Sequence, residues 1–77
     1  MRVKVKLLGI FSFAYPAFSK FRYIELEEGK TIKELQEHLG LPENMVCLVS
    51  VNGKMVGEGY RLVDGDEVVF FPAASGG

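Results

Sequence analysis

The sequence has few of the side chains from which enzymes build active sites. It contains one cysteine, one histidine and no tryptophan among 77 residues. A single cysteine cannot form an internal disulfide, so nothing ties the chain to an oxidising compartment. One cysteine and one histidine also cannot complete a zinc site or hold an iron–sulfur cluster. We therefore expect no self-contained catalytic or metal centre.

The sequence also has no large excess of positive or negative charge. Nine basic and ten acidic residues give a formal net charge of -1, and no block of like charge stands out. A nucleic-acid binder usually shows a basic patch or stripe, which this sequence lacks. We expect no nucleic acid among the partners.

Long hydrophobic runs are missing too, because the apolar segment near the start falls short of the roughly 20 residues that span a bilayer. Basic residues followed by LLGIFSFAYPAFS resemble a signal peptide. Against that interpretation, Val3, Val5 and Leu7 alternate with basic residues as strand residues do, and a glycine and a proline interrupt the run. We expect a cytoplasmic protein that does not bind membranes.

The composition that is present describes an ordinary soluble domain. Apolar residues make up 48% of the chain and charged residues 25%, and no internal repeat, linker or low-complexity segment is visible. A chain of this size buries only about 60% of the surface that it exposes when unfolded. One domain without a large enclosed active site is therefore expected.

The clearest element is a helix within GKTIKELQEHLG. Thr31 is placed to cap it, and Glu34 is placed to complete a capping box from the first turn. Gly40 supplies the left-handed stop. Strands are predicted at residues 1–8, from residue 23, at 45–51 as a strand covered on both faces, at 54–56 and at 67–71.

The connections between the later strands carry strong turn signals. Asn52 and Gly53 predict a hairpin, and the Asp-Gly-Asp sequence at 64–66 predicts a turn into the last strand. The ladder beside that strand is expected to end at Pro72, which has no N–H to donate. The order of elements predicts an α+β fold, the β-grasp of ubiquitin. It would be a mixed sheet of four to five strands, with one main helix on one face and the first and last strands adjacent in the centre. Residues 1–72 would form the domain and residues 73–77 a flexible tail ending in Gly-Gly.

Aromatic residues are concentrated near the start of the chain. Six of the nine lie between Phe11 and Tyr23, in a segment expected to be a loop between strands. Some of them would cover the open end of the core, and any exposed cluster would be a docking patch. Phe70 and Phe71 should alternate faces, one entering the core and the other lying beside the tail.

Several other polar residues receive no catalytic role. Cys47 lies in an apolar strand and is interpreted as a buried, inert thiol. His38 would make a favourable dipole contact in the last turn of the helix. Asp64 and Asp66 are interpreted as turn formers, and the Gly-Glu-Gly sequence at 57–59 does not have the spacing of a phosphate loop.

The last third of the chain, VNGKMVGEGYRLVDGDEVVFFPAASGG, resembles the carboxyl half of the ubiquitin-like sulfur carriers. It combines a VNG hairpin, a DGD turn, an apolar final strand and a Gly-Gly end. The nearest resemblance is to the small subunit of molybdopterin synthase, whose last strand commonly ends in a Phe-Phe-Pro run. Two differences are a single proline in the tail and an aromatic segment in place of a more polar helical one. Thiamin carriers share DGD and Gly-Gly but usually lack Phe-Phe-Pro.

The resemblance implies that the chain acts through its terminal carboxyl group. A ubiquitin-activating-like enzyme, using ATP and Mg, would adenylate Gly77, and sulfur from a donor protein would then convert it to a thiocarboxylate. The sulfur acceptor would be the large subunit of molybdopterin synthase or another sulfur-accepting enzyme, in molybdenum or tungsten cofactor synthesis. The chain itself would bind no cofactor and would serve as the sulfur-donating subunit of a synthase complex, without an independent active site.

The expected tail suits this use because it is long and thin. Six residues extended at about 3.3 Å each span roughly 20 Å, and glycines without a β-carbon fit a narrow channel. The residues expected to contact a partner are Phe11, Phe13, Phe71, Pro72, Ala73, Ala74, Ser75 and Gly76.

Other functions stay open from the sequence alone. The carrier could serve thiamin synthesis or tRNA thiolation, or it could be a protein modifier joined through Gly77 to lysines. A plain β-grasp interaction module is a further alternative, in which the small terminal residues are only a loose end.

Overall fold

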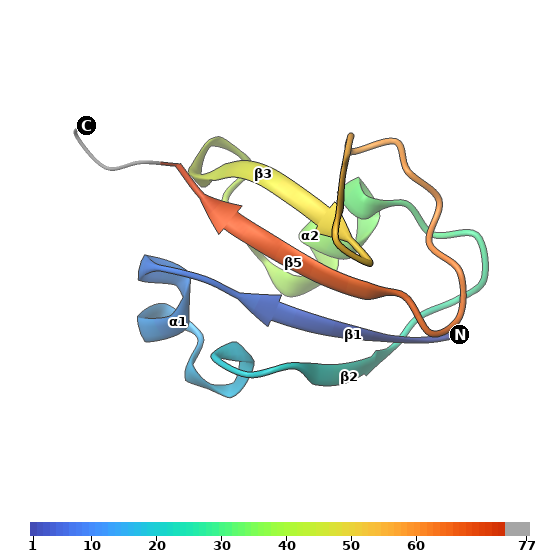
Figure 1. Cartoon of the computed structure of the whole chain (residues 1–77), viewed down its shortest axis with the longest axis horizontal. Coiled ribbons are helices and arrows are strands. Elements are labelled where there is room, and N and C mark those ends of the chain that lie inside the picture. Colours follow the sequence, from blue (N-terminus) through green and yellow to red (C-terminus); the bar gives the residue numbers. More distant parts are fainter. Residues whose placement is uncertain (74–77) are drawn as a thin grey trace.

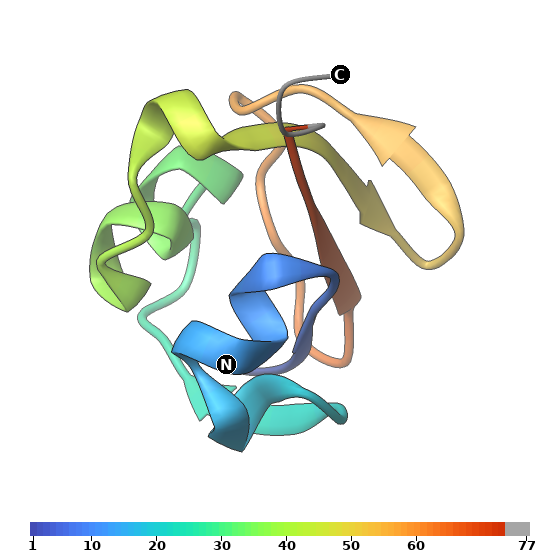
Figure 2. The same ribbon diagram turned by 90° about the vertical axis from the view of Figure 1, so that its left-hand side faces the viewer.

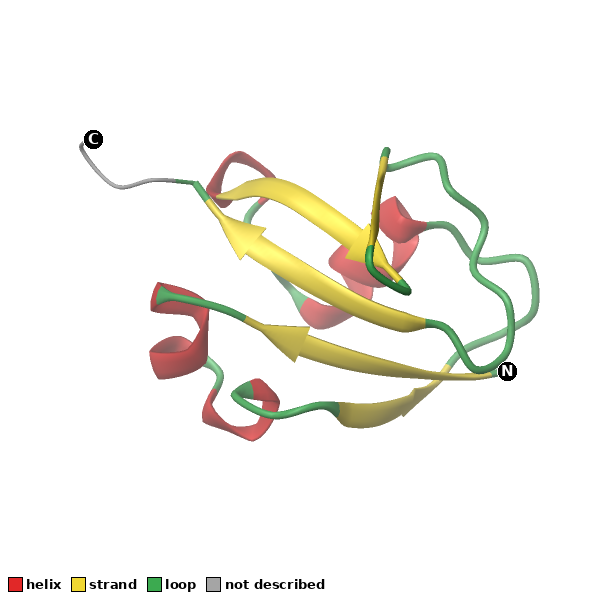
Figure 3. Cartoon of the chain, viewed as in Figure 1, coloured by secondary structure: helices red, strands yellow, loops and turns green. Residues whose placement is uncertain are grey.

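A computed structural model describes residues 1–73 as a mixed sheet with one main helix against one face (Figures 1 and 3). The strands run in the spatial order β2-β1-β5-β3-β4. The central strands β1 and β5 pair in parallel, and the other neighbours pair antiparallel. The predicted mixed sheet, with its first and last strands adjacent in the centre, is confirmed. The main elements are β1 (Arg2–Leu7), β2 (Arg22–Glu25), α2 (Ile32–Leu39), β3 (Val46–Val51), β4 (Lys54–Val56) and β5 (Glu67–Pro72).

The core lies between the sheet and α2. Alternate residues of each central strand point into it, as Val5 of β1 and Val68 of β5 do, and both are fully buried. Ile32 and Leu35 of α2 meet them from the helix and are fully buried as well. Because the helix covers only one face, the opposite face of β5 and β3 remains open, and Figure 1 shows α2 behind the sheet from that side.

The start and end of α2 follow the sequence prediction closely. The Glu34 backbone N–H donates to Thr31 Oγ1 at 3.2 Å, and the Thr31 backbone N–H donates to Glu34 Oε1 at 3.0 Å, which completes the capping box. Gly40 ends the helix with φ 72°. The hydrogen bond from the Thr31 backbone lowers the pKa of the Glu34 carboxyl below its ordinary value.

The β3–β4 hairpin is held by a buried carboxylate. Asn52 and Gly53 form the turn with φ values of 52° and 85°, as the sequence predicts. Asp66 is only 2% exposed and accepts hydrogen bonds from Asn52 Nδ2, the Tyr60 hydroxyl and the Val63 N–H. Asp66 is therefore more than a turn former, because it ties this hairpin to the start of β5. Burial and the hydrogen bond to Asp66 raise the pKa of Tyr60.

The aromatic segment after β1 is helical, which corrects the prediction of a loop. It forms α1 (Ile10–Ala14) and the 3-10 helix η1 (Pro16–Phe18). Figure 2 looks onto the end of the sheet where these two helices lie. Five residues are too few to show helical periodicity, and no side chain caps α1. A third short turn, η2 (Glu43–Met45), leads into β3.

Phe11 anchors α1 in the core. Its side chain is 2% exposed, while Tyr15 and Phe18 pack more loosely against the same core. The prediction that Phe11 contacts a partner is therefore wrong for this structure, because its ring is needed to close the end of the core.

Candidate functional site at the carboxyl end of β5

The residues predicted to work at the chain end lie at and beyond the end of β5. Phe71 and Pro72 are the last two residues of that strand, and Ala73 follows directly. The structure describes the chain up to Ala73, so Ala74, Ser75, Gly76 and Gly77 lie outside the described residues. The carboxyl end of β5 lies at the same end of the sheet as α1 (Figures 1 and 2).

The end of β5 is held on both sides. On the β1 side, the Leu8 N–H donates to the Phe70 carbonyl at 3.2 Å. On the β3 side, Pro72 pairs with Val46, and the Ala73 N–H donates to the Met45 carbonyl at 2.7 Å. The strand pairing ends at Pro72, as the sequence predicts, and the Ala73 N–H adds one further hydrogen bond beyond it.

An apolar surface on the open face of the sheet runs up to this point. The β3–β5 register places Leu48 beside Phe71. Two residues further along β3, on the same face, Ser50 lies between Val69 of β5 and Met55 of β4. Leu48 is 49% and Met55 57% exposed, while Phe71 and Val69 are half-buried. We call Leu48, Met55, Val69 and Phe71 the open-face patch. Its position beside the last described residues suits the docking of a partner that receives the chain end.

The structure confirms that Phe70 and Phe71 lie on opposite faces. Phe70 is fully buried in the core, and Phe71 is half-buried in the open-face patch. Leu48 and Met55 were not predicted as site residues, and for Leu48 the reason is that residues 45–51 were interpreted as a strand covered on both faces. The single helix in the predicted fold was the available signal, since one helix leaves one face of the sheet bare.

Two other exposed aromatic side chains lie outside the open-face patch, one on α1 and one at the β2 edge of the open face. Phe13 is 85% exposed on α1, as expected of a partner contact. Tyr23 is 58% exposed at β2, and the Arg2 and Lys4 cationic groups lie 5.1 Å and 5.5 Å from its ring centroid. Arg2 Nε also donates to Glu25 Oε1 at 3.0 Å, which raises the pKa of Arg2. This edge of the open face is therefore polar, in contrast to the patch over β3 and β5.

Cys47 is exposed, which corrects the prediction of a buried thiol. The β3–β5 pairing shifts register between Val46 and Leu48, and Cys47 is the extra residue of this bulge. A bulge interrupts the regular alternation of side chains between the two faces of the sheet, so the exposure of Cys47 could not be predicted from its apolar neighbours in the sequence.

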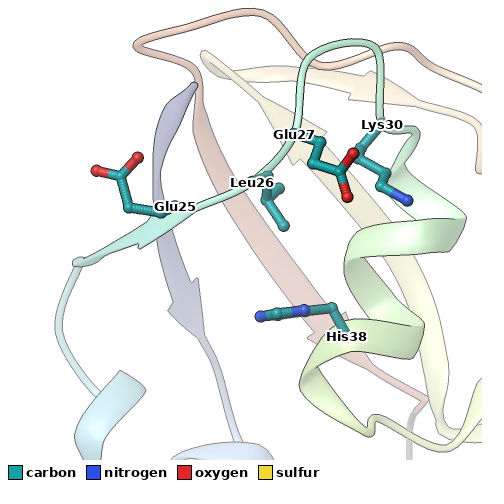
Figure 4. Close-up of a pocket in the computed structure, with 5 residues that line it drawn as sticks. All are labelled: Glu25, Leu26, Glu27, Lys30 and His38. Carbon is teal, nitrogen blue, oxygen red and sulfur yellow. The ribbon is translucent and has the colours of Figure 1, made fainter.

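A shallow pocket of about 410 Å³ lies between β2 and α2 (Figure 4). Glu25, Leu26, Glu27, Lys30 and His38 line it, and its charged side chains are of both signs. Within residues 1–73, no three histidine, cysteine or acidic side chains come close enough together to hold a metal ion. None of the helices in the described part of the chain is long and apolar enough to cross a membrane.

Solved structures share this fold. SAMP1 from Haloferax volcanii aligns with a TM-score of 0.77 at 18% identity, covering 100% of both chains. A putative molybdopterin converting factor, subunit 1, from Pyrococcus furiosus aligns with a TM-score of 0.75 at 28% identity, covering 96% of this chain and 99% of that one. These neighbours confirm the predicted ubiquitin-like β-grasp.

A third neighbour belongs to a complex of subunits 1 and 2 of the molybdopterin-converting factor from Helicobacter pylori 26695. It aligns with a TM-score of 0.62 at 25% identity, over 100% of both chains. No curated protein sequence matches the chain. The sequence profile of the ThiS family, by contrast, matches residues 11–77, which include all strands after β1 and the Gly-Gly end. The chain therefore belongs to the ThiS family of ubiquitin-like sulfur carriers.

Proposed function

We propose that the chain carries sulfur as a thiocarboxylate on Gly77 and donates it in molybdopterin synthesis, the pathway of the molybdenum or tungsten cofactor. The observation that carries this proposal is the arrangement at the end of β5. The last described hydrogen bond is made by Ala73 beside an exposed apolar patch, and four more residues follow in the sequence. Extended at about 3.3 Å per residue, they reach at most about 13 Å beyond that anchor.

The proposed chemistry takes place on the terminal carboxyl group. A carboxylate oxygen of Gly77 attacks the α-phosphorus of ATP, and pyrophosphate leaves with the electrons of the broken P–O bond. The terminal sulfur of a donor persulfide then attacks the acyl carbon and displaces AMP, forming an acyl persulfide. A second thiol cleaves its S–S bond and becomes a disulfide with the donor sulfur, and the thiocarboxylate remains on the carrier. ATP and Mg belong to the activating enzyme in this scheme, and the carrier binds no cofactor of its own.

Molybdopterin synthesis is favoured over other sulfur acceptors by two of the similar structures. One is described as a putative molybdopterin converting factor, subunit 1, and the other belongs to a complex of subunits 1 and 2 of that factor. The Phe-Phe-Pro run that precedes the small residues points the same way. The open-face patch would then dock the large synthase subunit, with Phe13 and the residues from Phe71 to Gly76 guiding the chain end into its active site.

A protein-modifier function is the second candidate, because the small archaeal modifier protein of H. volcanii shares the fold. A lysine amine can attack the same adenylate in place of sulfur, forming an amide bond to Gly77 as AMP leaves. Thiamin synthesis and tRNA thiolation would use the same thiocarboxylate with other acceptors. These functions differ only after the carboxyl group is activated.

The test incubates the purified chain with an activating enzyme, ATP and a sulfur donor, and measures the mass of the intact protein. Exchange of one oxygen for one sulfur is expected, and deletion of Gly77 should abolish it. The loaded carrier, mixed with the large synthase subunit and the sulfur-free precursor, should then yield molybdopterin. Loading without product formation would refute the molybdopterin role, and an ATP-dependent ladder of lysine conjugates in cell extract would favour the modifier function. No sulfur exchange with a competent enzyme would refute the carrier proposal itself.

A further inference from the structure

The corner between β1 and α1 lies against the end of β5. The pairing of β1 with β5 ends at Leu7 and Phe70, and the Leu8 N–H then donates to the Phe70 carbonyl. The next residue, Gly9, has φ 59° and ψ -135°. Residues other than glycine rarely adopt this backbone conformation. Figure 2 looks onto this end of the molecule.

Gly9 is in close contact with Pro72. A β-carbon added at position 9 would lie 2.8 Å from Pro72 Cγ and 3.5 Å from Cδ, and real β-carbons essentially never approach other atoms within 3.0 Å. The proline ring therefore occupies the space that any side chain at position 9 would need. The Gly9 carbonyl accepts hydrogen bonds from the Ser12 N–H at 3.0 Å and the Ser12 hydroxyl at 2.7 Å, which hold the corner in place.

The opposite side of Pro72 is fixed by β3 and η2. Pro72 pairs with Val46, and the Ala73 N–H donates to the Met45 carbonyl at 2.7 Å. Met45 is itself held in η2, where its N–H donates to the Pro42 carbonyl at 3.0 Å. Pro72 is thus enclosed between the backbone at Gly9 and the start of β3.

We propose that Gly9 is a positioning residue for activation of the chain end. By letting the Pro72 ring lie against its backbone, it fixes where Pro72 and Ala73 leave the sheet, and hence where residues 74–77 begin. This inference rests on the proposed function, because it concerns how the terminal carboxyl group reaches an activating enzyme. A shift of Pro72 and Ala73 moves the point from which these four residues extend.

The inference predicts a particular kinetic effect. Gly9 is not among the residues proposed to contact a partner, so a change there should leave docking to the activating enzyme, and therefore KM for the carrier, unaltered. A β-carbon at position 9 would lie too close to Pro72 Cγ, so either the proline or the Gly9 corner must shift, and the contact between them changes. Misplacement of a reacting group by about 1 Å can cost on the order of 100-fold in rate, so we expect Gly9→Ala to lower kcat about tenfold.

The experiment is a double-mutant cycle between Gly9→Ala and Pro72→Ala, measured by ATP–pyrophosphate exchange with the activating enzyme. Gly9→Ala should lower kcat about tenfold at unchanged KM in the wild-type background. In the Pro72→Ala background, which lacks Cγ and Cδ, it should lower kcat much less, because only the backbone strain at position 9 remains. Gly40→Ala is the control for backbone strain, because Gly40 has φ 72° and nothing within 4 Å of an added β-carbon. It should leave kcat and KM unchanged.

A second readout needs no enzyme. The Ala73 amide should exchange with solvent faster in Gly9→Ala than in the wild type or Gly40→Ala, because its hydrogen bond to Met45 depends on the position of Pro72. If Gly9→Ala does not fold, Pro72→Ala alone tests the inference. It removes the ring from the contact, so the Ala73 amide should exchange faster than in the wild type. Its kcat should fall by less than the tenfold expected for Gly9→Ala.

The outcomes separate this inference from the proposed function. A wild-type chain that supports no exchange with a competent activating enzyme refutes the proposed function. A wild-type chain that is activated, with Gly9→Ala unchanged, altered only in KM or equally impaired in both backgrounds, overturns the role of Gly9 alone. With Pro72→Ala as the deciding variant, unchanged Ala73 exchange and unchanged kcat overturn it.

Discussion

Replacement of Leu48 by alanine tests whether the open-face patch docks the sulfur-accepting partner. Leu48 lies beside Phe71 on β3, next to the last described residues of the chain. Its side chain is 49% exposed, so about half of its surface is already buried in the monomer and the remainder is available to a partner.

The size of the effect follows from that exposed fraction. Full burial of a leucine side chain contributes about 1.5–3 kcal/mol, so the surface left for a partner contributes about 1 kcal/mol. Since 1.4 kcal/mol corresponds to a tenfold change in Kd, Leu48→Ala should weaken binding of the large synthase subunit about fivefold. Burial of apolar surface is also insensitive to salt, so the wild-type Kd should change little between low and high ionic strength.

The assay is isothermal titration of the two purified proteins, with Val63→Ala as the matched control. Val63 is 57% exposed and lies in the loop before β5, near the amino end of that strand. Thermal denaturation checks that both variants are folded at the titration temperature. Equal loss of affinity in the two variants, or a steep salt dependence of the wild type, would refute the assignment of the docking face.

Three further predictions concern the fold that supports the site. Phe11→Ala should lower the free energy of unfolding by about 3–5 kcal/mol because its ring is buried, while Phe13→Ala should change it by less than about 0.5 kcal/mol; urea denaturation that ranks the two equally would contradict the assigned positions. Thr31→Ala removes the helix cap and should cost about 1 kcal/mol in the same assay, and an unchanged midpoint would contradict the capping box. The folded-state pKa of Glu34 is lowered, so its stabilising contribution is present above its ordinary pKa of 4.5 and is lost as the pH falls below that value. The stability difference between wild type and Glu34→Gln should therefore shrink in acid, and a difference that stays constant with pH would be contrary to this account.

The elements that are specified locally could be predicted from the sequence. The cap at Thr31, the stop at Gly40 and the Asn52-Gly53 hairpin depend on residues a few positions apart, and the structure has each of them. The adjacency of the first and last strands in the centre of the sheet followed from their apolar character. These features sufficed for the fold, because one helix and a short mixed sheet leave few ways to close a core.

Features that depend on tertiary contacts could not be predicted in this way. The α1 helix has no capping side chain and owes its place to Phe11, which fills the end of the core. The exposure of Cys47 arises from a bulge in the β3–β5 pairing, and the hydrogen bond beyond Pro72 forms because the Met45 carbonyl lies where it can accept from the Ala73 N–H. Each of these depends on where a distant segment lies, which the local pattern does not encode.

The central claim is that sulfur is carried on the terminal carboxyl group of Gly77 and not on a side chain. Cys47 offers the informative comparison, because an exposed thiol gains a sulfur atom by forming a persulfide, whereas a carboxyl group exchanges an oxygen for it. The most direct measurement is tandem mass spectrometry of the loaded protein after reconstitution with the activating enzyme, ATP and sulfur donor. The account predicts one oxygen-to-sulfur exchange confined to Gly77 and retained in Cys47→Ser. Sulfur found only as an addition at Cys47, with Gly77 unchanged, would contradict it.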